Sequence, residues 1–337
     1  MSGEEVGDLE TASPPRGGGL KTVAIFVAKV GVTAACFWYI SRQIDLTQVS
    51  GAFSLLDFRW AAIATLIAVL EMPLVAMRWR SILQALITLD VRMTRVAIIA
   101  ITTIALFFSQ VVPGIASEGF RAWLLVRIGC DWRNALTSVV LDRGVGLSLL
   151  IAMGVVILLL PSGVIALGGY RWPVLAFYAA LLVAGILGLL AAPKLVPLLA
   201  RWRYSRWIAV LARDAHRVLL GPKSPVIITI GCLIHVLTIV VVWLLGRAQG
   251  LSLPIADAAV LFTVMVGVTI VPISISGWGL REVAVMSLLG NLGVAPEKAL
   301  LFSVCFGLVF AVGSLPGAVV WLLYSPVPTP QPAGRGA

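Results

Sequence analysis

The sequence predicts an all-α fold, a polytopic bundle of membrane-spanning helices, and three observations support this class. Hydrophobic residues fill 60% of the 337 positions, while only 12% are charged. The mean hydropathy is +1.04, and several apolar runs approach or exceed the roughly 18 residues that indicate a spanning helix. We expect about six full transmembrane helices plus two re-entrant helical hairpins that are related as an inverted repeat.

The net charge of +10 narrows the choice of partners. In a soluble domain it would suggest nucleic acid, but no basic domain stands apart from the apolar runs, so we expect no nucleic-acid partner. Lys and Arg are better explained as topology signals and as contacts to anionic lipid headgroups at the cytoplasmic face. The four cysteines are scattered without metal-ligand spacing, and we expect no metal and no cofactor.

The chain divides into a membrane domain and two tails. Residues 1–19 are acidic and rich in Pro and Gly, which predicts a disordered N-terminal tail, and residues 324–337 predict a loose C-terminal tail. Residues 20–323 form the predicted transmembrane domain. Its first span follows an acidic start and is therefore not expected to be a cleaved signal. The six predicted spans are 22–40, 60–77, 135–160, 173–192, 225–246 and 299–323.

Two basic stretches, residues 78–95 and residues 193–224, decide the predicted topology. Cytoplasmic loops are enriched in Lys and Arg, so both stretches should lie in the cytoplasm. Residues 96–128 must then form a hairpin that enters and leaves on one side, because a full crossing would place the second stretch outside. Residues 258–272 would make about 22 Å of helix, short of a roughly 30 Å hydrocarbon core, and predict a second hairpin. Both termini are then cytoplasmic, as in a multi-pass protein of the bacterial inner (plasma) membrane.

Each predicted hairpin contains the same short pattern. Val112-Pro113, then five residues, then Gly119-Phe120-Arg121 parallels Val271-Pro272, six residues, and Gly279-Leu280-Arg281. In both places a short helix breaks at proline and a half-helix with an early arginine follows. Inverted repeats of this kind are the usual architecture of alternating-access transporters. The expected repeat halves are residues 96–160 and 258–323.

The second break, within residues 271–290, is the strongest candidate site. A broken intramembrane helix is tolerated where its freed backbone groups line a cavity. Arg281 should lie in the first turn of the half-helix, where free N–H groups and the helix dipole attract an anion such as a lipid phosphate. The alternative is a structural salt bridge of Arg281 with Glu282 or Asp142. The other candidate binding residues of this segment are Ser274, Ser276, Gly277 and Gly279.

The first hairpin and the helix after it supply four more candidates. Glu118 and Arg121 lie three residues apart on one helical face, so they can bind substrate or pair with each other. Asp142 and Arg143 lie inside a predicted span, where charged groups face the bundle interior or water. Being adjacent, they should bond to the hairpins rather than to each other. Elsewhere, Glu71 and His235 could relay protons or serve as hydrogen-bonded packing residues.

Two further patterns concern lipid and oligomer contacts. Gly313 and Gly317 form a GxxxG pattern, a hint of close helix packing and weak evidence for a homodimer. A second stretch predicts a basic amphipathic helix that rests on anionic lipid. The arginines that share its polar arc are Arg203, Arg206, Arg213 and Arg217.

These motifs together resemble the flippase-like transmembrane family of lysylphosphatidylglycerol synthases over about residues 20–323. The resemblance implies a module that translocates lipid, without the soluble aminoacyl-transferase domain of bifunctional members. Residues 116–118, Ala-Ser-Glu, depart from the family's double glycine, which weakens the site role of the first hairpin. The matching residues are Arg78-Trp79-Arg80, Pro113 to Arg121, Leu141-Asp142-Arg143 with Gly146, and Pro272, Gly277, Gly279, Arg281 and Glu282.

Three functions are compatible with these sequence features. The first is a flippase that moves a phospholipid or another lipid-linked, phosphate-bearing substrate between leaflets. The second is a small-solute secondary transporter with the same inverted-repeat architecture. The third is a membrane enzyme, which we do not expect, because the sequence has no His/Cys cluster, no paired catalytic carboxylates in a soluble domain and no nucleotide-binding loop. If Arg281 binds the phosphate, its replacement should impair transport more than replacement of Arg121.

Overall fold

The computed structural model describes residue 54 and residues 56–90, 93–111, 114–160, 171–200, 206–270 and 279–323, and the regular structure in this part of the chain is helical. Five helices there are long and apolar enough to cross a membrane, which confirms five of the six predicted spans. The first predicted span and both predicted tails lie outside the described residues. The five candidate spans are Phe58–Leu86, Trp132–Leu159, Arg171–Pro197, Ser224–Ala248 and Pro296–Leu323.

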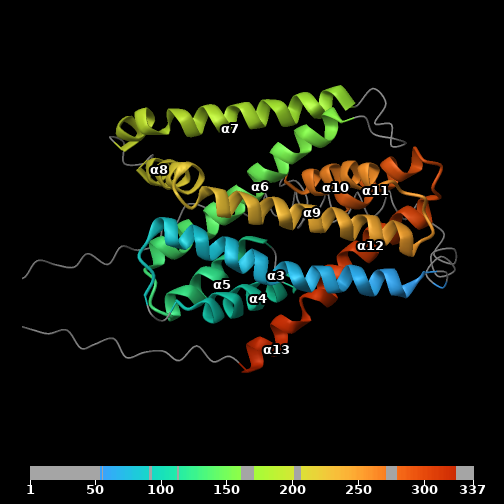
Figure 1. Ribbon diagram of the computed structural model, residues 1–337, viewed down its shortest axis with the longest axis horizontal. Coiled ribbons are helices and arrows are strands. Elements are labelled where there is room, and N and C mark those ends of the chain that lie inside the picture. The colour runs from blue at the N-terminus through green and yellow to red at the C-terminus, as the bar shows by residue number, and fades with distance from the viewer. Residues whose placement is uncertain are drawn as a thin grey trace, which may run out of the picture.

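Figure 1 shows how the helices are arranged. The bundle is centred on α3 and α9, which pack along each other, while α7 lies at one edge and reaches the bundle through α6 and α8. The helices are α3 (Phe58–Leu86), α4 (Arg95–Val111), α5 (Gly114–Arg127), α6 (Trp132–Leu159), α7 (Arg171–Ala200), α8 (Arg206–Leu220), α9 (Ser224–Ala248), α10 (Ile255–Ile270), α11 (Leu280–Gly290), α12 (Pro296–Gly313) and α13 (Leu315–Leu323).

Two of the long helices begin at aspartates that cap their free N–H groups. The Asp57 carboxylate accepts a hydrogen bond from the backbone N–H of Arg59, and Asp131 accepts from the N–H groups of Arg133 and Asn134. A side-chain oxygen at this position satisfies donors that the first turn leaves unpaired. The caps explain why α3 and α6 start two and three residues before the predicted spans.

The end of α3 corrects the predicted loop after the second span. The helix continues from Met77 to Leu86, and Arg78 is only 7% exposed. It is therefore an interior residue of the bundle and not part of a cytoplasmic loop. The prediction was wrong because an isolated arginine is costly in an apolar bundle, whereas Arg78 forms an ion pair with Asp142 on α6.

The short helices pack in pairs where the sequence predicts hairpins. α4 contacts α5, and Met93 before α4 lies in the same buried cluster as Ile128 after α5, so this pair starts and ends at one end of the bundle. α10 contacts α11 in the same way, and each second helix packs against the long helix that follows it. An inverted relation between the pairs, and re-entry into a membrane, remain predictions.

One groove brings the two basic stretches together. Arg80, residues 84–89 and Lys223 line it, and Ile82 at the end of α3 is buried in the same cluster as Val218 of α8. Because one groove has residues from both stretches, they lie on the same side of the molecule, as the charge distribution predicts. That this side is the cytoplasm remains a prediction.

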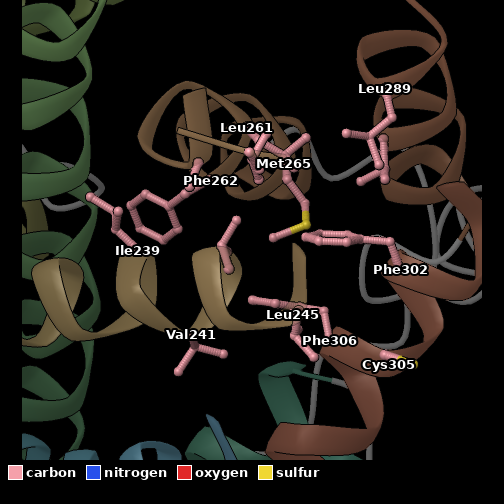
Figure 2. Packing of buried hydrophobic residues seen from close by; sticks show 14 of the residues in the cluster. Ile239, Val241, Leu245, Leu261, Phe262, Met265, Leu289, Phe302, Cys305 and Phe306 are labelled. Carbon is pink, nitrogen blue, oxygen red and sulfur yellow. The ribbon is translucent and has the colours of Figure 1, made fainter. Parts of the chain in front are cut away.

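The largest buried cluster lies where α9, α10, α11 and α12 meet. Figure 2 shows Phe262 of α10 pointing toward Ile239 of α9, and the Met265 sulfur beside the ring of Phe302 of α12. A thioether beside an aromatic ring is a favourable packing contact. The cluster holds the second helix pair rigidly against the long helices.

Gly313 and Gly317 serve contacts within the chain. A Cβ on Gly313 would lie 3.2 Å from Cβ of Ala68 on α3, and one on Gly317 would lie 2.2 Å from the Thr103 carbonyl oxygen on α4. Small residues at such crossings let helix backbones approach closely. Both glycines of the GxxxG pattern thus pack against helices of the same chain, and the pattern is explained without a homodimer.

Tyr178 anchors α7 to the bundle. Its ring occupies the space beside Gly154 of α6 and Gly267 of α10, where an added Cβ would lie 2.7 Å and 1.8 Å from Tyr178 atoms. Its hydroxyl donates a hydrogen bond to the Thr263 carbonyl oxygen at 2.9 Å. Beyond this anchor, much of α7 is exposed, and nothing lies within 4 Å of a Cβ built on Gly185.

Candidate functional site

Asp142 is the centre of a buried ionic cluster. It lies ten residues after the start of α6, about 15 Å along the helix axis, and is 1% exposed. Arg78 of α3 donates from Nε to Oδ1, and Arg121 of α5 donates from Nη1 to Oδ2, each at 2.9 Å. One carboxylate therefore accepts hydrogen bonds from two arginines on two other helices. Arg121 belongs to the α4–α5 pair, so Asp142 bonds to the first predicted hairpin, as expected.

The cluster continues outward through Glu118. Nη1 of Arg121 lies 3.8 Å from Glu118 Oε2, and Arg143 donates to Glu118 Oε1. The side chain of Arg143 is 61% exposed. The five side chains, which we call the charge row, thus alternate in sign from the exposed Arg143 through Glu118, Arg121 and Asp142 to the buried Arg78. Three cations and two anions leave the row with one excess positive charge.

Arg121 has unused hydrogen-bonding capacity. Its Nε and Nη2 atoms are buried and have no hydrogen-bond partner among the described residues. Its guanidinium carbon lies 3.9 Å from the ring centroid of Trp79, whose Nε1 donates to Ser138 Oγ at 3.2 Å. The ring stabilises the cation but accepts no conventional hydrogen bond. Among the described residues, two donor atoms of this buried guanidinium are therefore left without an acceptor.

Gly146 of α6 makes room for Arg78. A Cβ on Gly146 would lie 3.3 Å from Arg78 Nη1. The contact at Gly146 is tighter than ordinary van der Waals contact, so a larger residue would displace the guanidinium. The sequence pattern that places Gly146 four residues after Asp142 is thus explained by the path of the Arg78 side chain.

A second ionic cluster lies at the start of α11. Gly279 has φ of +85°, and its N–H donates to Glu282 Oε2 at 2.6 Å. The other oxygen of Glu282 accepts from Arg281 Nη2 at 2.7 Å and from the Ser303 hydroxyl of α12 at 3.0 Å. Glu282 is 1% exposed. The carboxylate therefore caps the helix and joins α11 to α12.

This arrangement changes the expected role of Arg281. A backbone N–H, a guanidinium and the helix N-terminus do converge on one anionic group, but that group is the carboxylate of Glu282. The structural salt bridge, which the sequence left as the alternative, is the one observed with Glu282. Asp142 is occupied by Arg78 and Arg121 instead. Ser274, Ser276 and Gly277 lie outside the described residues.

The structure thus sorts the candidates into two groups. Glu118, Arg121, Asp142 and Arg143 belong to the charge row, and Gly279, Arg281 and Glu282 belong to the cluster at α11. Within the described ranges, no ion pair joins one group to the other. Arg78 was missed as a site residue, although the Arg-Trp-Arg pattern was visible and a buried Asp142 required a cation as its partner.

Two grooves lie along α6, the helix that carries Asp142 and Arg143. One, of about 580 Å³, lies between α6 and α8, and the other, of about 400 Å³, lies between α6, α7 and α8. Val140 lines the first and Ser148 the second, and the exposed Arg143 lies one turn after Val140, beside the first groove and about 140° around the helix from Ser148. The second groove is largely apolar, with lining residues that include Ile151, Leu181, Leu182, Ile186, Leu189 and Leu219.

Comparison with known proteins adds a family. The family described as the lysylphosphatidylglycerol synthase TM region matches residues 26–317, most of the chain. No curated protein matches the chain significantly. In the part of the chain that the structure describes, no group of three or more His, Cys, Asp or Glu side chains is placed to hold a metal ion.

Proposed function

Because the chain belongs to the family of the lysylphosphatidylglycerol synthase TM region, we propose that this multi-pass membrane protein is a lipid flippase. Its substrate is a phospholipid or another lipid-linked molecule with a phosphate, moved between the leaflets of a bacterial inner membrane. The observation that carries the proposal is the charge row, which has an excess positive charge and, on Arg121, two donors without a partner among the described residues.

A lipid phosphate matches the chemistry of these donors. Guanidinium presents parallel N–H groups that fit two oxygens of a phosphate, and it stays charged in a low-dielectric environment. A phosphate with one negative charge would balance the excess charge of the row. It would also supply acceptors for Nε and Nη2 of Arg121.

The exposed end of the row provides an entry point. Arg143 is exposed on α6 beside Leu136 and Val140 of the first groove, so a phosphate can meet its guanidinium while acyl chains lie against apolar side chains. Glu118 links Arg143 to Arg121, and a phosphate between the two arginines would repel this carboxylate. Movement of the α4–α5 pair, which carries Glu118 and Arg121, would then transfer the headgroup inward.

The exposed side chains of α8 suit a position at the membrane surface. Its buried residues are Ala209 and Val218, whereas Trp207 is exposed and Arg206 lies at its first position. A basic amphipathic helix of this kind binds anionic headgroups, and we propose that α8 rests on the cytoplasmic face with both termini in the cytoplasm. Arg203 of the predicted arc lies outside the described residues.

A small-solute secondary transporter is the second candidate. The arginines of the charge row fit a free phosphate or carboxylate as well as they fit a lipid phosphate, because a guanidinium forms the same hydrogen bonds with each. The apolar groove between α6, α7 and α8 favours a lipid, because a small hydrophilic anion does not need it. A transport assay with both kinds of substrate separates the two.

The test is leaflet-resolved transport of headgroup-labelled phospholipid in liposomes that contain the purified chain. Wild-type protein should move lipid, and Arg121→Lys should slow it about tenfold or more, because the charge remains but the forked donors are lost. Arg127→Ala, on the same helix but outside the row, is the matched control and should transport normally. Wild-type rates in a well-folded Arg121→Ala protein would refute the phosphate site. Uptake of a free anion without lipid movement would favour the second candidate.

A further inference from the structure

Glu71 is a buried carboxyl group that the charge row does not use. It lies on α3 seven residues before Arg78, on the same face and about 10 Å away along the helix axis, and is 6% exposed. Within the described residues, no ion pair includes Glu71. Its hydrogen-bond contact is with the hydroxyl of Thr238 on α9, at 3.2 Å.

Thr238 can donate its single hydroxyl hydrogen either to Glu71 or to Ile234, and the two choices imply different charge states of Glu71. A threonine hydroxyl has one hydrogen to donate and can accept through its lone pairs. Thr238 Oγ1 lies 3.0 Å from the carbonyl oxygen of Ile234, which can only accept, and 3.2 Å from Glu71 Oε1. If the hydroxyl hydrogen points to Ile234, the second contact is a hydrogen bond only when Glu71 carries a proton and donates it to Thr238.

The ionised form of Glu71 would lack compensation. A carboxylate inside an apolar bundle is costly unless cations or several donors surround it. Here it would share one hydroxyl hydrogen with a carbonyl group and have no cation within ion-pair distance among the described residues. A neutral carboxylic acid satisfies both Glu71 and Thr238 with two ordinary hydrogen bonds.

The ionisable groups near this position are few. On α3 the next one is Arg78, which Asp142 of α6 holds, and on α9 it is His235, one turn before Thr238. The other helices that pack against α3 also carry ionisable residues. These are Arg95 at the start of α4, Arg133, Asp142 and Arg143 on α6, Glu297, Lys298 and Cys305 on α12, and Arg206, Arg213, Asp214, His216 and Arg217 on α8, which packs near Ile82 at the far end of α3. Cys232 and Arg247 are the remaining ionisable residues of α9.

His235 connects this position to the charge row. Its Nε2 lies 2.9 Å from the Gly146 carbonyl oxygen, so this nitrogen carries a hydrogen and donates it. A Cβ on Gly146 would in turn lie 3.3 Å from Arg78 Nη1. His235, one turn from Thr238 on α9, therefore contacts the α6 residue that lies beside the Arg78 guanidinium.

We propose that Glu71 is a proton-binding site, occupied in this conformation, whose proton exchange with bulk water drives lipid movement by the charge row. The driving role rests on the proposed flippase function. On release of the proton to water, Glu71 becomes a carboxylate two turns from Arg78, and it then competes with Asp142 for that guanidinium. Loss of Arg78 from Asp142 leaves the carboxylate to Arg121 alone, so the proton state of Glu71 alters the affinity of the row for a phosphate.

The first experiment detects the proton directly, without transport. Infrared difference spectra of the full chain in lipid nanodiscs, recorded across a pH titration, should show the C=O stretch of a protonated carboxylic acid at pH 7, where an ordinary glutamate with a pKa of about 4.3 is ionised. Glu71→Gln should remove this band, whereas Glu297→Gln should leave it. Thr238→Val should shift its frequency, because the acceptor of the proton is lost. Absence of the band at pH 7 would overturn the proposal.

The second experiment measures coupling. In liposomes with an imposed pH gradient, the initial rate of lipid movement in the wild type should depend on the direction of the gradient. Glu71→Gln imitates the neutral acid permanently and should lose this dependence, while Glu297→Gln should keep it. A gradient response that persists in Glu71→Gln, or wild-type transport that ignores the gradient, would refute the coupling. A wild-type protein that moves no lipid would refute the proposed function instead, and the infrared band would still decide whether Glu71 binds a proton.

Discussion

Arg121 donates from Nη1 to Asp142 at 2.9 Å, yet its Nε and Nη2 atoms find no hydrogen-bond partner in the described part of the chain. The reason is that Arg78 takes the other oxygen of the same carboxylate. One buried anion between two buried cations leaves a surplus of positive charge and of donors. This surplus distinguishes the charge row from the cluster at α11, where the four donors that meet Glu282 saturate its carboxylate.

Asp142→Asn should destabilise the protein strongly. The change removes the charge that balances Arg78 and Arg121 without removing much volume, and breaking a buried ion pair costs about 3 to 5 kcal/mol. Thermal unfolding of the detergent-purified protein measures the effect. Glu297→Gln, a carboxylate in the first turn of α12, is the control and should unfold near the wild-type temperature. An Asp142→Asn protein as stable as the wild type would show that the two arginines do not depend on this carboxylate.

Gly317→Ala should weaken the packing of α13 on α4. The added Cβ would lie 2.2 Å from the Thr103 carbonyl oxygen, a backbone atom that cannot rotate away, and overpacking of this kind costs about 1 to 3 kcal/mol. Gly185→Ala on α7 is the matched control, since nothing lies within 4 Å of its new Cβ. Thermal unfolding should separate the two variants while both keep the wild-type size on gel filtration. A change of oligomeric state in Gly317→Ala alone would instead place this glycine at a subunit interface.

Cysteine labelling should locate the two basic stretches on the same face of the membrane. Leu86→Cys and Leu220→Cys should react with an impermeant maleimide only from the cytoplasm, and Ala166→Cys, which lies outside the described residues, only from the other side. Burial, and to a lesser extent Asp131, raises the pKa of the Cys130 thiol to about 11, so this native cysteine in the turn before α6 stays protonated and contributes little background. Labelling of positions 86 and 220 from opposite sides would contradict both the first hairpin and the groove that the two stretches share.

Glu282→Gln should destabilise the start of α11, and its effect on transport should be the smaller one. Its buried carboxylate accepts from Gly279, Arg281 and Ser303, and the amide leaves the Arg281 guanidinium without its anion. We expect a lower unfolding temperature with a transport rate per folded molecule that falls less than in Arg121→Lys. Arg281→Lys should likewise lower the unfolding temperature and slow transport less than Arg121→Lys does. The sequence predicted the opposite, a larger effect on transport at Arg281 than at Arg121. Full loss of transport in a stable Arg281→Lys protein would restore Arg281 as the principal phosphate ligand.

The long spans and the class of the fold could be predicted because hydropathy and length are local properties. The partners of Asp142 could be predicted only in part, since the cost of an isolated charge requires a cation but does not say which one. Arg121 was among those considered, whereas Arg78 was assigned to a loop because the helix end was set at the first charged residue. The pairing of Arg281 with Glu282 depended on how the side chain of Glu282 folds back onto Gly279, a detail that spacing alone does not determine.

The most direct test is an experimental structure of the protein in lipid nanodiscs that contain phospholipid. The phosphorus of a bound lipid should lie within hydrogen-bonding reach of Arg121, with phosphate oxygens about 2.7 to 2.9 Å from Nε or Nη2, and its acyl chains should follow the groove between α6, α7 and α8. Density that satisfies both Arg121 donors with protein groups or water alone, while lipid phosphates remain at the membrane surface, would contradict the phosphate site.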